Sequence, residues 1–403
     1  MIKRQIFIVF LFFLESCSND SKGSGSSSGS SAPKPVTETL KYYNHYPFNF
    51  VYTMNLTLGN QSIEAVVDTG SANLLVLGDS TLCTSCVNDY GFTSLYSKGA
   101  NSLSLDTSWY MNFAPIGFAN IQGYQDNLKA FGNTLSTYSF GVVTSEKGIP
   151  NIIGLGYKAV ASPTDSPQTP VFDSLISKYK FNNQFSTTLC GTKKGSNLTI
   201  GGYDSVLSSV LSKVQWTSIS QRKWYQVSLS KMYTSETTAF GFATSQWSWE
   251  PTSSDNVIVD SGTNPLVIPS AQIEPLVAVL KSFASSNSIN IADSFWPTSS
   301  AKGSFATIAD ADIAKFPDLK FDFPTFSDEN KNFTLTVKPS MYFQTRADNG
   351  QRYLAIQGGS GPYILGTAFM ESYVVLHNRG AFNSASTDSS AKVGFYPSDS
   401  FCR

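Results

Sequence analysis

Ile63-Glu64-Ala65-Val66-Val67-Asp68-Thr69-Gly70-Ser71 is an apolar, β-branched run that ends in an acidic residue and a loop of hydroxyl residues around a glycine. The same order of residue types returns at Val257-Ile258-Val259-Asp260-Ser261-Gly262-Thr263. Such a run is typical of a buried strand, and the glycine permits a sharp turn with close backbone approach. Each copy is therefore expected to carry one carboxylate out of a strand into a tight loop.

The spacing of the two copies makes them informative. A single copy would be weak evidence, because Asp, Ser and Gly are also the residues of ordinary turns. Two copies lie 192 positions apart (260 − 68), each behind an apolar strand. This pattern indicates an internal duplication, and we expect it to bring Asp68 and Asp260 together at a twofold interface.

The two loops resemble those of pepsin-family aspartic proteases, and the resemblance implies that Asp68 and Asp260 form a catalytic dyad. Two carboxyls this close share one proton and titrate as a pair. The ionised carboxyl then takes a proton from a water held between them, while the protonated one polarises the peptide carbonyl. The resemblance also implies three supporting pairs of residues. Gly70 and Gly262 expose backbone N–H groups near the carboxylates, and Ser71 and Thr263 donate hydrogen bonds to the outer carboxylate oxygens. Thr69 and Ser261 lock the two loops to each other.

Two further segments follow the family pattern, at 151–157 and 363–369, each an apolar run around a glycine that threads beneath one Asp loop. The resemblance extends over about residues 46–397. It implies an all-β, bilobal pepsin-like fold with two pseudo-symmetric, barrel-like lobes and a few short helices. The expected domains are a signal peptide at 1–17, a Ser/Gly linker at 18–35, an N-terminal lobe at 36–208 and a C-terminal lobe at 209–403.

The composition excludes several classes of function. The chain of 403 residues has 41% hydrophobic residues, 14% charged residues and a net charge of −1, so charge favours neither nucleic acid nor an anionic membrane surface. His45 and His377 are its two histidines, and no Cys/His cluster points to a metal site. We expect a monomer that acts on polypeptides without a metal or cofactor.

The N-terminal segment predicts export. Lys3 and Arg4 precede an apolar run, 6–14, that is too short to span a membrane but suits a signal peptide. Residues 14–17 resemble a lipoprotein processing site, with Cys17 as the lipid anchor; plain secretion and a buried N-terminal helix are the alternatives. The protein is thus expected to be secreted or extracytoplasmic. Lys22 and Lys34 are the only basic residues of the linker, so we expect no inhibitory basic prosegment.

Four cysteines lie downstream of Cys17. Cys83 and Cys86 stand where the family has a small disulfide loop, and a structural disulfide is favoured there over a redox or zinc element because no second Cys pair accompanies them. Cys190 and Cys402 fall in segments that the family places in a shared sheet. They either form a bridge or remain two buried thiols.

Residues 108–128 are expected to form the flap, a hairpin that closes over the substrate. The family alignment places Phe113 where a Tyr is usual and Leu75 where a Trp often bonds that Tyr, and the tip at 114–117 departs from the Gly-rich pattern. If the alignment of this hairpin with the family is shifted, Trp109 or Tyr110 takes the place of Phe113 over the substrate. The alternative is a plain hairpin that has no role in substrate binding. The expected substrate contacts are Leu75, Phe113, Ile116, Gly117 and Ile152.

The sequence as a whole predicts an aspartic endopeptidase that prefers apolar residues beside the scissile bond. A catalytically weak peptide-binding or inhibitor-like module on the same fold is the first alternative, since the flap departs from the family pattern. A structural surface lipoprotein in which both Asp motifs are ordinary turns is the second.

Overall fold

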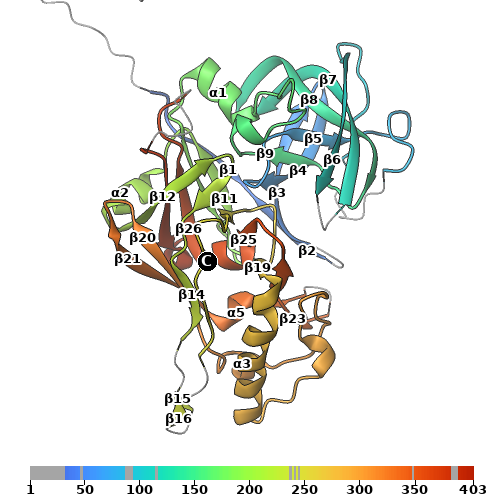
Figure 1. The fold of residues 1–403 in the computed structure, drawn as a ribbon. Coiled ribbons are helices and arrows are strands. Elements are labelled where there is room, and N and C mark those ends of the chain that lie inside the picture. Colours follow the sequence, from blue (N-terminus) through green and yellow to red (C-terminus); the bar gives the residue numbers. More distant parts are fainter. Residues whose placement is uncertain are drawn as a thin grey trace, which may run out of the picture. The chain divides into compact units, whose positions relative to one another are not determined.

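The computed structural model describes residues 32–45, 49–86, 94–113, 117–235, 238–239, 242–243, 246–346, 349–382 and 389–403. The predicted signal segment with Cys17, residues 18–31 of the linker and the flap-tip residue Ile116 lie outside them. Residues 33–403 form one compact unit, built mainly of β-strands with short helices (Figure 1). The predicted all-β fold is confirmed.

Eight of the described strands form a sheet that carries Asp68 and the hairpin predicted to be the flap, drawn from blue to green in Figure 1. In spatial order they are β2 (Lys41–His45), β3 (Asn49–Leu58), β4 (Gln61–Asp68), β9 (Ile152–Gly154), β5 (Leu74–Leu77), β8 (Asn133–Lys147), β7 (Gly117–Ala130) and β6 (Leu103–Phe113). From Ile63 to Asp68, every residue of β4 is buried, because both faces of this strand are covered.

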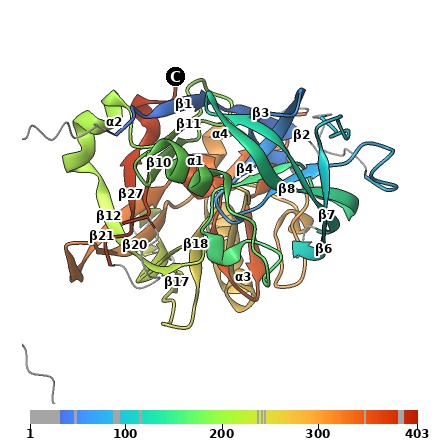
Figure 2. The ribbon, with the colours of Figure 1, turned by 90° about the horizontal axis from the view of Figure 1, so that it is seen from above.

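A second sheet joins strands from both halves of the sequence. Its described strands are, in spatial order, β1 (Val36–Thr39), β11 (Asn197–Ile200), β10 (Gln184–Thr188), β26 (Tyr373–Asn378), β27 (Lys392–Pro397), β12 (Gln215–Arg222), β13 (Tyr225–Val227), β18 (Val257–Val259), β25 (Tyr363–Leu365), β19 (Leu266–Pro269) and β24 (Ile356–Gly359). Figure 2 shows β10, β27 and β12 close together in this central sheet. The predicted lobe boundary at 208/209 falls inside helix α2 (Ser205–Val210) and stays a prediction.

The remaining described strands form three smaller sheets. The other described strands are β17 (Ser248–Trp249), β14 (Lys231–Thr234), β20 (Leu319–Thr325) and β21 (Asp328–Val337) in one sheet, β15 (Thr238–Ala239) with β16 (Phe242–Ala243), and β22 (Phe343–Thr345) with β23 (Arg352–Leu354). The helices besides α2 are α1 (Val171–Tyr179), α3 (Ile273–Ser286), α4 (Asp310–Ile313), α5 (Pro339–Tyr342) and α6 (Thr367–Met370), with 3-10 turns η1 (Lys158–Val160), η2 (Leu211–Lys213), η3 (Ser270–Gln272), η4 (Asp293–Phe295) and η5 (Ser398–Ser400). None of the described helices is both long and apolar enough to cross a membrane.

The strand pairings repeat the duplication seen in the sequence. In the first half, β4 pairs in parallel with β9, which pairs antiparallel with β5, and β5 pairs in parallel with β8. In the second half, β18 pairs in parallel with β25, which pairs antiparallel with β19, and β19 pairs in parallel with β24. Each Asp strand therefore lies beside its own glycine strand, in the same topology.

Two disulfides connect the four described cysteines. Cys83 and Cys86 close the small loop after β5, which confirms the structural disulfide predicted there. Cys190 and Cys402 are also bonded, so the open alternative is resolved in favour of a bridge. The second disulfide attaches the C-terminal end of the chain to the segment that follows β10.

His377 on β26, a strand of the central sheet, is fully buried. Its ring stacks on Phe185 at 4.3 Å between centroids and meets the Tyr225 ring edge-on at 4.4 Å. Neither ring nitrogen has a hydrogen-bond partner among the described residues. Burial, helped by the charge of nearby Arg379, lowers the pKa of His377 to about 3. The imidazole is therefore neutral in the folded protein across most of the acid range.

This burial predicts a specific loss of stability in acid. Between about pH 6.5 and pH 3 the unfolded chain binds a proton at His377 that the folded protein does not bind. The free energy of unfolding should fall over this window by about 1.4 kcal/mol per pH unit from this group alone. His377→Phe should reduce the dependence of stability on pH between 6.5 and 4.5, whatever its effect at neutral pH. Urea unfolding at several pH values measures both slopes, and equal slopes in parent and variant would contradict the prediction.

Candidate active site

The two Asp loops hold their carboxylates in the same way. Asp68 ends β4, and its Oδ1 accepts a hydrogen bond from the Gly70 N–H at 2.7 Å, while its Oδ2 accepts one from the Ser71 hydroxyl at 2.5 Å. In the second loop the Gly262 N–H donates to Asp260 Oδ1 at 2.8 Å and the Thr263 hydroxyl to Oδ2 at 2.7 Å. Each carboxylate is thereby fixed within its own loop.

Thr69 and Ser261 join the loops through four reciprocal hydrogen bonds. The Thr69 N–H donates to the Ser261 hydroxyl at 3.1 Å, and the Ser261 N–H donates to the Thr69 hydroxyl at 2.9 Å. The Thr69 hydroxyl in turn donates to the Val259 carbonyl at 2.9 Å, and the Ser261 hydroxyl to the Val67 carbonyl at 2.8 Å. All of these groups are buried, so the bonds are protected from competing water.

The glycines let each loop approach the carboxyl of the other. A Cβ built on Gly70 would fall 2.6 Å from the Asp260 carboxyl carbon, and a Cβ on Gly262 would fall 2.6 Å from that of Asp68. No side chain fits at either position. The structure thus brings Asp68 and Asp260 together, although they are 192 residues apart in the sequence.

Both carboxyls are largely withdrawn from solvent. Asp68 is 8% exposed and Asp260 is 6% exposed. Burial, followed by repulsion from Asp260, raises the pKa of Asp68 well above its usual range, against the opposing hydrogen bonds from Ser71 and Gly70. The pair therefore retains one proton to a higher pH than an exposed aspartate would, which gives one acid and one base at the same place.

Two glycine strands support the loops from below. A Cβ on Gly154 would lie 2.6 Å from the backbone of Ala72, and one on Gly366 would lie 2.5 Å from the carbonyl oxygens of Thr263 and Pro265. Asp68 and Gly154 are register partners in the parallel β4–β9 pair. The glycines therefore set how deeply each loop sits on its neighbouring strand.

An apolar cluster lies between β5, the strand that follows the first loop, and the hairpin of β6 and β7, which is the predicted flap. We call it the flap cluster; its buried members are Leu75, Leu77, Ala119, Ile121, Val143, Ile149 and Ile152, with Cys86, Trp109, Met111 and Phe113 packed against them. It contains three of the predicted substrate contacts: Leu75, Ile152 and Phe113. The fourth, Gly117, pairs with Phe113 across the flap strands and packs against the Lys147 carbonyl, and the fifth, Ile116, lies outside the described residues.

Trp109 occupies the space beside Leu75. A Cβ on Gly141 would lie 2.7 Å from Leu75 Cδ2 and 3.1 Å from Trp109 Cζ2, so both side chains cover this glycine. The Trp109 indole N–H is buried and has no hydrogen-bond partner among the described residues. Its neighbour Tyr110, on the opposite face of β6, is 59% exposed. Trp109 therefore contributes an indole from β6 to the cluster, and Phe113 at the end of the same strand pairs with Gly117.

A polar network behind the second loop was missed by the sequence analysis. The Asn264 amide donates to Gln344 Oε1 at 2.8 Å and to the Thr367 hydroxyl at 2.9 Å, and the Tyr353 hydroxyl also donates to Gln344 Oε1. The Thr367 N–H donates to the Thr263 carbonyl at 2.8 Å, which links this network to the Asp260 loop. No sequence signal marks Gln344 or Tyr353, because their positions depend on the β22–β23 pairing.

The described residues contain no group of three or more His, Cys, Asp or Glu side chains placed to hold a metal ion. The site as described consists of two carboxyls, hydroxyl and backbone donors, and an apolar wall. Such a site suits acid–base chemistry on a neutral, polar bond next to apolar groups.

Comparison with known proteins identifies the family. Residues 51–386 match the model of the eukaryotic aspartyl protease family. Similar proteins include pepsin A of Gallus gallus, 24% identical over 364 residues (86% of each chain), and cathepsin E of Rattus norvegicus, 24% identical over 366 residues (86% of this chain and 81% of the relative). The beta-secretase of Strongylocentrotus purpuratus is 22% identical over 368 residues, 81% of this chain but only 64% of that protein, so this chain spans less than two thirds of its length. The match over most of the chain, together with the paired Asp loops, shows that this protein belongs to the eukaryotic aspartyl protease family.

Proposed function

We propose that this protein is an aspartic endopeptidase in which Asp68 and Asp260 activate a water molecule to hydrolyse internal peptide bonds. The observation that carries the proposal is the reciprocal approach of each carboxyl to the glycine of the other loop. In this arrangement the two carboxyls share one proton and lie close together, and each is held by hydrogen-bond donors of its own loop. A water between them loses a proton to the ionised carboxyl, while the protonated carboxyl donates to the carbonyl oxygen of the substrate.

We also propose that the protein is secreted or extracytoplasmic. Two disulfides suit an oxidising compartment, which supports a secreted or extracytoplasmic enzyme. The predicted signal peptide, the lipid anchor on Cys17 and the monomeric state remain proposals from the sequence.

The dyad is tested by replacing each carboxyl with an amide. Asp68→Asn and Asp260→Asn should each lower kcat at least a hundredfold, because an amide cannot accept or deliver the proton. Cleavage of an unstructured protein, with and without pepstatin, measures the effect, and circular dichroism shows whether the fold is retained. A folded Asn variant that keeps the parent rate would refute the dyad. A parent without turnover would instead favour a peptide-binding module.

The raised pKa of Asp68 predicts how activity depends on pH. The singly protonated pair is the competent form, and it loses its remaining proton only above the usual range of an aspartate. Activity should therefore extend above strongly acid pH, with the alkaline decrease set by the upper apparent pKa of the pair. A profile of kcat/KM from pH 2 to 8 tests this, and a sharp optimum below pH 3 would contradict it.

The flap cluster supports a preference for apolar side chains beside the scissile bond. Trp109→Ala removes the largest side chain packed against this cluster, so kcat/KM for a peptide with Leu beside the cleaved bond should fall at least tenfold. Tyr110→Ala is the matched control, because Tyr110 precedes the same turn of the flap but faces outward. It should leave kcat/KM within about twofold of the parent. Equal effects of the two substitutions would show that the cluster does not select the substrate.

A further inference from the structure

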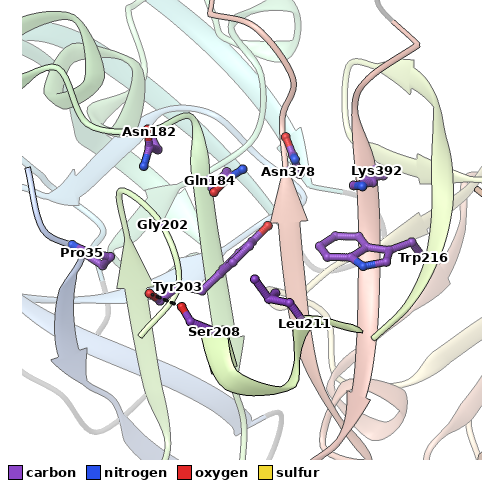
Figure 3. A pocket seen from close by; sticks show the side chains of 10 residues that line it. All are labelled: Pro35, Asn182, Gln184, Gly202, Tyr203, Ser208, Leu211, Trp216, Asn378 and Lys392. Atoms are coloured by element: carbon purple, nitrogen blue, oxygen red, sulfur yellow. Dashed lines mark hydrogen bonds between the residues drawn. The ribbon is translucent and has the colours of Figure 1, made fainter. Parts of the chain in front are cut away.

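A groove crosses the central sheet on the strands β10, β26, β27 and β12. It is separate from the Asp loops, which follow β4 and β18. Its volume is about 530 Å³, within the usual range of ligand pockets. The lining includes three polar side chains, Gln184, Asn378 and Lys392, and three apolar or aromatic ones, Tyr203, Leu211 and Trp216 (Figure 3).

The polar side chains form a row because their strands are in register. Gln184 on β10 is the cross-strand partner of Asn378 on β26, and Asn378 is the partner of Lys392 on β27. Register partners lie on the same face of a sheet, so two amides and one ammonium are presented side by side. Figure 3 shows these three side chains across adjacent strands along one side of the groove.

The aromatic side chains form the other part of the groove. Trp216 is the register partner of Gly394, and a Cβ at that glycine would lie 2.7 Å from the indole ring. The missing side chain lets the indole lie against the sheet. Tyr203 is 6.3 Å from Trp216 between ring centroids, and both pack on the small apolar cluster of Leu207, Val214, Val374 and Leu376.

Two polar groups of the groove, the Lys392 ammonium and the Tyr203 hydroxyl, have no hydrogen-bond or ion-pair partner among the described residues. The Lys392 ammonium lies over the rings of Trp216 at 4.6 Å and Phe326 at 4.4 Å, and no carboxylate of the described residues pairs with it. Partial burial lowers the pKa of Lys392, so an anion would stabilise its charged form. The Tyr203 hydroxyl is buried and likewise has no partner in the described part of the chain. Because buried polar groups are usually hydrogen-bonded, two such groups without partners are consistent with a polar ligand at this groove.

We propose that this groove binds the C-terminal end of a peptide whose last residue is apolar. The ammonium of Lys392 pairs with the free α-carboxylate, and the amides of Gln184 and Asn378 hydrogen-bond the preceding peptide group. The last side chain packs between Trp216, Leu211 and Tyr203. Peptide hydrolysis creates such ends, but binding at this groove does not require turnover at the Asp loops.

The test compares three compounds that separate the contribution of the carboxylate from that of the apolar side chain. N-acetyl-L-leucine carries the carboxylate and side chain, N-acetyl-L-leucinamide carries the same side chain with a neutral end, and acetate carries the charge alone. Isothermal titration calorimetry of the full chain at pH 6.5 should show at least tenfold tighter binding of N-acetyl-L-leucine than of either other compound. Equal affinities, or no binding of N-acetyl-L-leucine, would overturn the proposal.

Variants assign the binding to the groove. Lys392→Met should abolish the preference for the carboxylate, and Lys392→Arg should retain it. Lys231→Met is the matched control, since Lys231 also lies over an aromatic ring but on β14, and it should leave binding unchanged.

Gln184→Ala provides a second test at a half-buried position and should weaken N-acetyl-L-leucine binding at least threefold. Cleavage of a protein substrate, measured in parallel, reports on the Asp loops separately, because loss of one activity does not entail loss of the other. Unchanged binding in both Lys392→Met and Gln184→Ala would refute the assignment.

Discussion

The four hydrogen bonds between Thr69 and Ser261 are the interaction on which the site depends. They connect two loops that belong to different halves of the chain, and they are buried between two apolar strands. Because each hydroxyl both accepts from the opposite N–H and donates to an opposite carbonyl, neither loop can shift without leaving a buried polar group unsatisfied. The separation of Asp68 and Asp260 is therefore set by the backbone and not by the acids themselves, which would repel one another if both were ionised.

The site and the core respond to acid in opposite ways. The Asp pair retains one proton to a higher pH than an exposed aspartate does, because burial raises the pKa of Asp68. His377, buried on β26 of the central sheet, has a lowered pKa, so protonation of this residue in acid favours the unfolded chain. Acid therefore favours protonation of the Asp pair in the folded protein, while through His377 it favours the unfolded chain.

Much of the site could be predicted from the sequence because its signals are local. Asp68 and Asp260 each stand in a short motif behind an apolar strand, and the repetition of that motif distinguished it from an ordinary turn. The family resemblance then supplied the glycine strands and the small loop of Cys83 and Cys86. Features that depend on distant contacts were not accessible in this way. The bridge between Cys190 and Cys402 spans 212 residues without any local pattern, and Trp109 fills the space beside Leu75 only because of the packing around Gly141.

The disulfide between Cys190 and Cys402 has a consequence for the survival of the molecule in the presence of proteases. Any single backbone cut between residues 191 and 401 leaves two fragments that remain covalently attached. The fragments stay at a high effective concentration, so the central sheet, which draws strands from both, reassembles without a search through solution. A nicked molecule of this kind would migrate as one species until its disulfides are reduced, and it would lose its structure only after reduction separates the pieces.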